Sequence, residues 1–225
     1  MAGYLQNLYQ SLDFSALFDG LRRAAAVLLC LSVHETCHGL AALALGDPTA
    51  KERDRLSLNP LHHIDWLGLA MMFFAGFGWA KPVPVDPRYF KNPKWGMALT
   101  SLAGPASNFL LAVFSMLLAR GLVSLEAVVP DGAVDLLYAF TLFLAADVTI
   151  LSLGLGVFNL IPIPPLDGSK VLAAFLPERA WLVWMRFERY GMILLLAVVL
   201  LGWEGNFVSR AVYWLYSLLV GGFFS

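Results

Sequence analysis

The sequence predicts an all-α membrane protein whose helices cross the bilayer several times. Of its 225 residues, 59% are hydrophobic and only 14% are charged, whereas ordinary globular domains carry about 25% charged residues. Long apolar stretches recur along the chain, separated by loops that hold most of the Pro and charged residues. The formal net charge is −1, so no basic field attracts nucleic acid. This composition disfavours a soluble domain, a disordered chain and a nucleic-acid-binding protein.

Four stretches have the length and apolar character of core transmembrane helices, each of which needs about 20 residues. They are residues 24–45, 98–119, 136–160 and 190–203, the last with an amphipathic lead-in from residue 181. Residues 66–80 are shorter and contain three glycines, so we expect a re-entrant, β-like segment on the cytoplasmic side. Residues 207–224 are apolar but interrupted by Arg210, and either span the bilayer or lie at its surface.

We expect residues 1–225 to form one membrane-embedded domain without a separate soluble part. Residues 1–20 contain no Lys or Arg and place apolar side chains at helical spacing, which predicts an amphipathic helix on the membrane surface and not a signal peptide. The motifs with chemical function fall within residues 24–172, the predicted catalytic core. Residues 181–224 are predicted to form C-terminal helices.

The placement of Lys and Arg predicts the orientation of the chain. Residues 46–95 hold seven of these cations and residues 168–189 hold four, whereas residues 121–135 hold none. Loops rich in Lys and Arg stay in the cytoplasm. We therefore expect the N-terminus outside the cell, with the mild exception of Arg22 and Arg23, and the loops of residues 46–95 and 168–189 inside.

A motif of ionisable side chains lies inside the first predicted span: His34, Glu35 and His38. The two histidines lie one helical turn apart on one face, so both imidazoles can reach a single metal ion. Glu35 projects from the neighbouring face, where it can hold a water molecule as the general base of zinc hydrolysis. The alternative, two buried histidines packed without a metal, gives no reason for an ionisable Glu in a membrane helix.

Zinc held by two histidines needs a third protein ligand. Asp167 is the best candidate, because the three prolines within residues 159–168 end a predicted span and fix an extended chain near the cytoplasmic side. A solvated Asp in a turn before Gly168 is the alternative. We interpret His62 and His63, in the cytoplasmic loop, as interfacial or structural residues and not as ligands.

Two further polar residues lie within predicted spans. We expect Asn108 to hold helices together beside Gly104 and Ala106, with a direct role at the substrate as the second option. Asp147 has no evident partner in the sequence, so it is either protonated or lines a path for water.

Taken together, these motifs resemble those of the site-2 protease family, zinc metalloproteases that cleave transmembrane substrates within the bilayer. The resemblance spans residues 33–172 and departs from the family mainly at Trp66, where we expect Pro or a small residue after Asp65. No PDZ-like or CBS domain is recognisable, so we expect a minimal form of the family. The matching blocks are His34-Glu35-x-x-His38 and residues 46–51, 55–61, 63–65, 78–85, 103–108 and 159–168.

The resemblance implies a helical membrane core that binds one zinc ion near the cytosolic side. It implies that Asp167 is the third ligand and that Asn159 lies near the active site and handles substrate backbone. It also implies a multi-pass protein of a prokaryotic plasma or inner membrane, surrounded by lipid. Substrates of relatives are often single-span regulators such as anti-sigma factors.

The expected function is therefore hydrolysis of peptide bonds in transmembrane proteins by a zinc-activated water. A membrane transporter and a metal-binding membrane protein without catalysis are the alternatives, and a transporter would need paired broken helices, of which only one end is evident. The sequence selects neither a particular substrate nor an oligomeric state.

Overall fold

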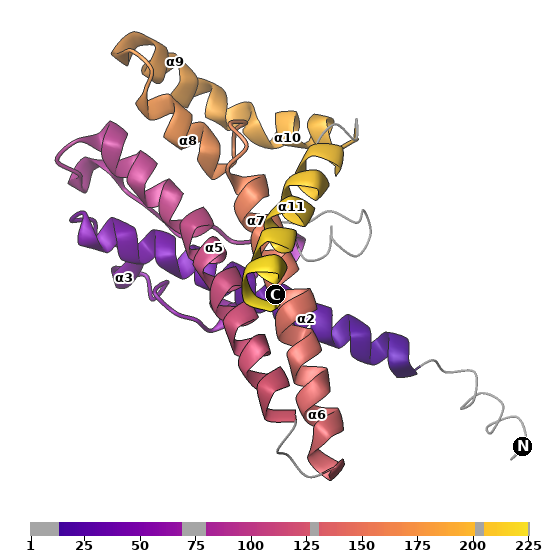
Figure 1. Cartoon of the computed structure of the whole chain (residues 1–225). Coiled ribbons are helices and arrows are strands. Elements are labelled where there is room, and N and C mark those ends of the chain that lie inside the picture. The colour runs from indigo at the N-terminus through magenta and orange to yellow at the C-terminus, as the bar shows by residue number, and fades with distance from the viewer. Residues whose placement is uncertain (1–13, 69–79, 127–130, 201–204, 225) are drawn as a thin grey trace, which may run out of the picture.

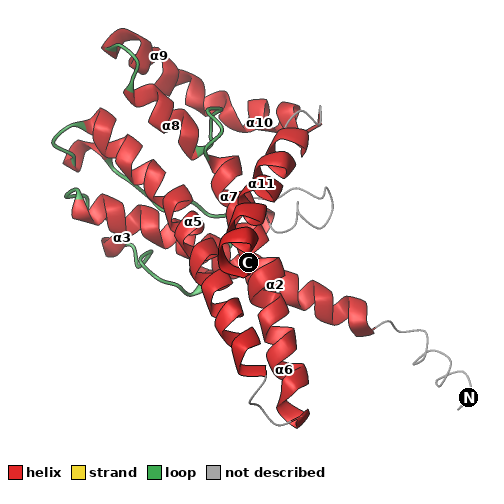
Figure 2. Cartoon of the chain, viewed as in Figure 1, coloured by secondary structure: helices red, strands yellow, loops and turns green. Residues whose placement is uncertain are grey.

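The computed structural model describes residues 14–68, 80–126, 131–200 and 205–224. Throughout these ranges the regular structure is helical and no β-strand occurs (Figure 2). The α-helices are α2 (Phe14–Ala44), α3 (Thr49–Glu52), α5 (Pro93–Glu126), α6 (Asp131–Leu142), α7 (Thr149–Asn159), α8 (Asp167–Ala174), α9 (Glu178–Phe187), α10 (Gly191–Leu200) and α11 (Gly205–Phe224). The π-helix η3 (Phe143–Val148) joins α6 to α7, and short 3-10 turns are η1 (Pro60–His62), η2 (Pro87–Tyr89) and η4 (Glu188–Tyr190).

Among the described residues, three helices are long and apolar enough to cross a membrane: Phe18–Ala44, Pro93–Leu125 and Val134–Asn159. They coincide with the first three predicted spans, and the third runs without a break through α6, η3 and α7. The fourth predicted span is not confirmed, because α10 has ten described residues and reaches only about 15 Å. The C-terminal stretch, whose placement the sequence left open, forms the 20-residue helix α11.

Side chains on α5 are distributed as expected for a helix in lipid. The large side chains of Leu110 and Phe114 are 71% and 62% exposed, whereas the small residues Ala112, Ser115 and Ala119 are buried. Small residues at helix contacts let membrane helices approach closely, and large apolar side chains are stable against lipid. This distribution, together with the three apolar helices, identifies a membrane protein.

Helix α5 is the centre of the bundle. It packs against α2, α6, α7, α8 and α11 (Figure 1). Pro105 lies inside α5 and is completely buried, at a point where it removes one backbone hydrogen bond from the helix. Nearby, Ser107 donates a hydrogen bond to the carbonyl of Gly104 (2.7 Å).

The predicted re-entrant segment, residues 66–80, lies mostly outside the described residues, which omit 69–79. Its first three residues, 66–68, are helical. At its end Ala80 forms an isolated antiparallel bridge with Ile64, so β-like pairing is present at this point. The predicted surface helix of residues 1–20 is likewise described only from Phe14, where the chain is already part of α2.

The extended segment of residues 80–86 is tied to the loop that follows α2. Lys81 N–H donates to the carbonyl of His63 (2.9 Å). Asp86 N–H donates to the carboxylate of Asp47 (2.7 Å), a side chain with no exposed surface. These bonds hold the segment beside the C-terminal half of α2.

Asp147, to which the sequence assigned no partner, forms an ion pair. Its Oδ2 lies 3.0 Å from Nε of Arg22 on α2, and Arg22 also approaches Asp19 at 3.3 Å. Asp147 is buried and belongs to the π-helix η3. The pair therefore links the N-terminal half of α2 to the middle of the third spanning helix.

Candidate active site

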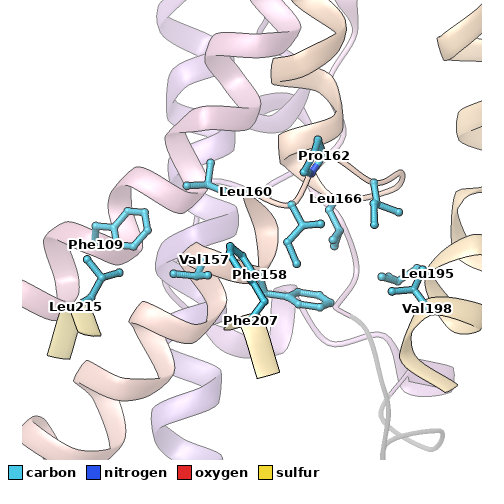
Figure 3. A pocket seen from close by; sticks show the side chains of 12 residues that line it. Phe109, Val157, Phe158, Leu160, Pro162, Leu166, Leu195, Val198, Phe207 and Leu215 are labelled. Carbon is cyan, nitrogen blue, oxygen red and sulfur yellow. The ribbon is translucent and has the colours of Figure 1, made fainter. Parts of the chain in front are cut away.

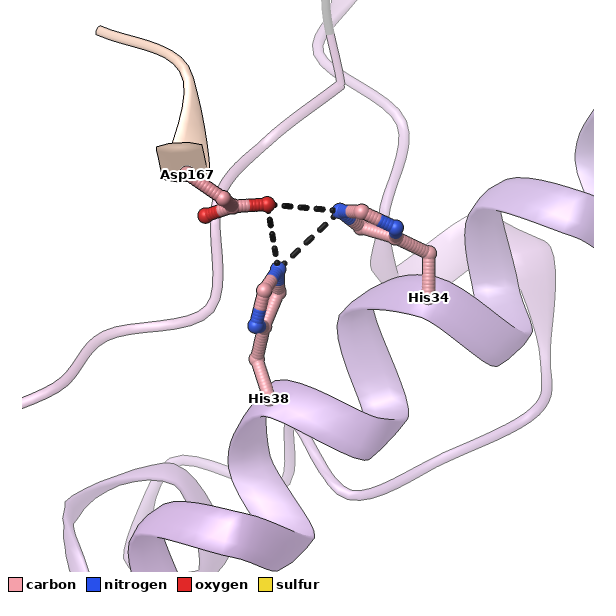
Figure 4. A group of neighbouring side chains, drawn as sticks. All are labelled: His34, His38 and Asp167. Carbon is pink, nitrogen blue, oxygen red and sulfur yellow. Dashed lines mark hydrogen bonds and ion pairs between the residues drawn. The ribbon is translucent and has the colours of Figure 1, made fainter. Parts of the chain in front are cut away.

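Three side chains from two distant parts of the chain converge in the interior (Figure 4). Nε2 of His34 and Nε2 of His38 are 3.0 Å apart. Oδ2 of Asp167 lies 3.2 Å from the first of these nitrogens and 3.1 Å from the second. All three residues are at most 8% exposed. The geometry thus brings together the residues that the sequence analysis proposed as metal ligands.

Local structure accounts for this convergence. His34 and His38 lie one turn apart on α2 and present their rings to the same side. Asp167 is the first residue of α8, directly after the turn in which Leu166 N–H donates to the carbonyl of Ile163 (2.9 Å). The prolines thus end α7 and turn the chain back into the bundle, as the interpretation of Asp167 as a ligand requires.

The hydrogen bonds of His38 indicate what the site binds. Its Nδ1 lies 2.7 Å from the carbonyl of Thr100, which can only accept, so Nδ1 carries the hydrogen. In the neutral ring Nε2 is then a lone-pair acceptor, and it faces the acceptor Oδ2 of Asp167. Two acceptors 3.1 Å apart repel each other unless a metal ion or a proton lies between them.

The dimensions of the cluster fit a tetrahedral zinc site. Bonds of 2.0–2.2 Å from zinc to nitrogen or oxygen place neighbouring ligand atoms about 3.3 Å apart. The three separations here are 3.0, 3.1 and 3.2 Å. The Thr100 carbonyl is also the kind of outer partner that orients a zinc-binding histidine.

Gly104 makes room for the imidazoles. A Cβ at this position would overlap Nε2 and Cε1 of His38 and Cε1 of His34. The backbone of α5 therefore approaches the two rings as closely as a residue without a side chain allows. Gly168 has a similar role beside Asp167, where a Cβ would overlap the carbonyl of Leu160.

Glu35 is positioned next to the cluster but does not belong to it. Its Oε2 accepts a hydrogen bond from Val83 N–H (3.0 Å) in the extended segment. Glu35 lines a cavity of about 440 Å³ together with His34, His63 and Asn159. The carboxylate is thus held at the wall of this cavity.

The two asparagines that the sequence singled out lie in different environments. Asn159 is the last residue of α7, lines this cavity and donates from Nδ2 to the carbonyl of Leu155 (3.0 Å). Asn108 is completely buried in α5 and is not among the residues that line the cavity. Neither amide atom of Asn108 has a hydrogen-bond partner within the described part of the chain.

A second cavity of about 610 Å³ adjoins the first and is lined by apolar residues of α5, α7, α10, α11 and the proline turn (Figure 3). Phe158, Leu166 and Leu195 line both cavities. This apolar cavity therefore extends to Leu166, the residue directly before Asp167 in the sequence.

Several contributions could not be read from sequence motifs. The Thr100 carbonyl and the Val83 N–H are backbone groups, which no residue type reveals. Gly104 and His63 lie in motifs that match the family. The position of Gly104 against the imidazoles and that of His63 in the cavity depend on how the helices and loops pack.

Comparison with known proteins gives one consistent result. The model of peptidase family M50 matches residues 23–202. The chain is 38% identical over 175 residues to the "Putative zinc metalloprotease YwhC" of Bacillus subtilis; the aligned residues make up 76% of this chain and 77% of that protein. It is 32% identical over 215 residues to the "Putative zinc metalloprotease Rip2" of Mycobacterium tuberculosis, covering 93% of this chain and 77% of the relative. No solved structure matches the chain. The chain therefore belongs to peptidase family M50, the site-2 protease family.

Proposed function

We propose that this protein is an intramembrane zinc endopeptidase that hydrolyses peptide bonds of transmembrane protein substrates. The observation that carries the proposal is the convergence of His34, His38 and Asp167, beside Glu35, among helices long and apolar enough to span a membrane. The cofactor is zinc, in keeping with the family and with the names of its relatives.

His34, His38 and Asp167 are the residues that would hold the ion. When bound, zinc supplies a Lewis acid and makes water a stronger nucleophile near neutral pH. The protein's own part is to fix the three ligand atoms, and the Thr100 carbonyl does this for His38 by setting its tautomer and ring orientation.

Glu35 is the proton carrier in this proposal. Its carboxylate takes the proton of the attacking water and later donates it to the leaving amine nitrogen. Because Val83 N–H binds Oε2, the other carboxylate oxygen, Oε1, is left to hold the water. No covalent bond between protein and substrate is needed.

A transmembrane helix must unwind before its peptide bonds can react, which exposes backbone N–H groups inside the membrane. We assign the edge of residues 76–85 to pairing with the unwound substrate; residues 76–79 lie outside the described ranges. The carbonyls of Pro82 and Pro84 have no backbone donor within the described part of the chain, so they are available to substrate N–H groups. Asn159, at the wall of the same cavity, is assigned to contact the substrate backbone.

The orientation follows from the charge distribution. We place the N-terminus outside the cell and the zinc site toward the cytoplasm, in the plasma or inner membrane. Three apolar helices of suitable length support a multi-pass arrangement.

The decisive experiment compares Glu35→Gln with wild type in proteoliposomes that contain a single-span substrate. We expect the variant to bind one zinc per chain and to cleave at least 100-fold more slowly, on the order of what an efficient general base contributes. Glu52→Gln, on the exposed helix α3, is the matched control and should cleave normally. Cleavage by Glu35→Gln at the wild-type rate would contradict the proposal. Wild-type protein that binds zinc and cleaves nothing would favour the metal-binding alternative.

A further inference from the structure

His63 has the burial of a core residue and a position in the active-site cavity. It is 3% exposed, and its backbone is fixed on both sides: its N–H donates to the carbonyl of Pro60, and its carbonyl accepts from Lys81 N–H, both at 2.9 Å. It lines the cavity that also contains His34 and Glu35. It is nevertheless not part of the metal cluster.

The ring of His63 is anchored to the helix that carries the metal-binding motif. Its Nε2 lies 2.7 Å from the carbonyl of Ser57. The same carbonyl accepts a hydrogen bond from Oγ1 of Thr36 (2.8 Å), which lies between Glu35 and His38 on α2. One loop carbonyl therefore joins His63 to the catalytic segment of α2.

This anchor determines the chemistry of the other ring nitrogen. A carbonyl oxygen only accepts hydrogen bonds, so Nε2 of His63 carries the hydrogen, and Nδ1 of the neutral ring offers a lone pair. Nδ1 is buried and has no hydrogen-bond partner within the described ranges. Buried polar atoms in folded proteins are normally paired, so the lone pair of Nδ1 needs a donor that the described residues do not supply.

We infer that His63 is a substrate-binding residue whose Nδ1 accepts a hydrogen bond from a backbone N–H of the unwound substrate. The inference rests on the proposed function. The lone pair needs a donor, and the donor that every peptide segment presents after leaving its helix is the amide N–H. His63 thereby adds an acceptor to those of Pro82 and Pro84, and Pro82 lines the same cavity.

Two substitutions separate this role from a structural one. In His63→Gln the side-chain amide can still donate to the Ser57 carbonyl from the place of Nε2, but the acceptor at Nδ1 is lost. In His63→Asn the side-chain oxygen can occupy the place of Nδ1, but the anchor is lost. His62→Gln, at the exposed neighbouring histidine, is the control.

We expect His63→Gln to keep the wild-type thermal stability and one bound zinc, and to raise KM for a synthetic transmembrane peptide about 10-fold, the factor that a hydrogen bond of ordinary strength provides. His63→Asn, where it folds, should recover part of this loss. A wild-type KM for His63→Gln would show that only the hydrogen bond to Ser57 matters and would overturn the inference.

A substrate-side measurement tests the pairing directly. Peptides in which single amides near the scissile bond are replaced by esters lack one N–H at a time. One position should weaken binding to wild type and have no effect on His63→Gln. If the wild-type enzyme cleaves the peptides but no ester position distinguishes it from His63→Gln, the role of His63 is overturned and the proposed function stands. If the wild-type protein cleaves none of the peptides, the proposed function is overturned and this role with it.

Discussion

Nε of Arg22 lies 3.0 Å from Oδ2 of Asp147, so an ion pair joins α2 to the π-helix of the third span. The side chain of Asp147 is 10% exposed and that of Arg22 is 25% exposed. A carboxylate in an apolar interior is stable only when it is paired. Asp147 is therefore a contact between helices and not an isolated acid.

Removing one partner of this pair should destabilise the protein. Arg22→Gln leaves the carboxylate of Asp147 without its partner, which costs about 3–5 kcal/mol where burial is complete. Asp147→Asn should cost less, because Arg22 is more exposed and still has Asp19 at 3.3 Å. We expect a lower midpoint of thermal unfolding in detergent for each single variant. The double variant should lose less than the sum of the two, because it leaves no unpaired charge. Additive losses would refute the coupling, and Arg23→Gln, at the exposed neighbouring position, is the control.

Gly104→Ala should weaken zinc binding, because the new Cβ overlaps both imidazoles. We expect a loss of 10–100-fold in zinc affinity, on the order of what displaced outer contacts cost at zinc sites. Competition with a chelator measures this affinity. Gly121→Ala, on the same helix but with open space around its Cβ position, should bind zinc like wild type. Equal affinity in the two variants would show that α5 does not pack against the rings as described.

Asp167→Ala should abolish the stabilisation that zinc gives to the folded protein. A ligand that binds only the folded state raises its stability in proportion to the logarithm of ligand concentration over Kd. Added zinc should therefore raise the unfolding midpoint of chelator-treated wild type and leave that of Asp167→Ala unchanged. Lowering the pH toward 5 should reduce the wild-type response, since imidazole ligands must lose their protons to bind metal. A zinc response retained in Asp167→Ala would exclude this carboxylate as a ligand.

Introduced cysteines test the orientation. In a background with Cys30 and Cys37 replaced by Ala, we expect Ser124→Cys to react with a membrane-impermeant maleimide in intact cells. Lys51→Cys, exposed at the other end of the helices, should react only after permeabilisation. The reverse pattern would place the zinc site toward the outside.

Helical periodicity was sufficient to predict part of the candidate site. The spacing of His34 and His38 places them on one face whatever the rest of the chain does, and the prolines before Asp167 identify the turn that returns it to the bundle. Neither feature depends on the rotation of one helix against another. For the same reason the first three spans were predicted, since length and apolar character decide them.

Contacts between helices could not be predicted in this way. Arg22 and Asp147 are 125 residues apart, and only the packing of α2 against η3 brings them together. Asn108, for which we expected helix packing first and a role at the substrate second, is completely buried in α5 and does not line the active-site cavity, because the rotation of α5 turns it inward. The sequence classed His63 as structural or interfacial, and its unpaired Nδ1 became evident only from the anchor at Ser57.

The segment with Pro82 and Pro84 has one more consequence. Successive residues of an extended chain direct their backbone groups to opposite edges, so the edge formed by these two prolines offers oxygens but no hydrogens. Two copies of the protein that met along this edge would set carbonyl against carbonyl and repel. An open edge is normally a hazard for uncontrolled association; an edge of carbonyls alone fits the proposed substrate, whose unwound chain presents N–H groups, and does not fit the same edge of a second copy.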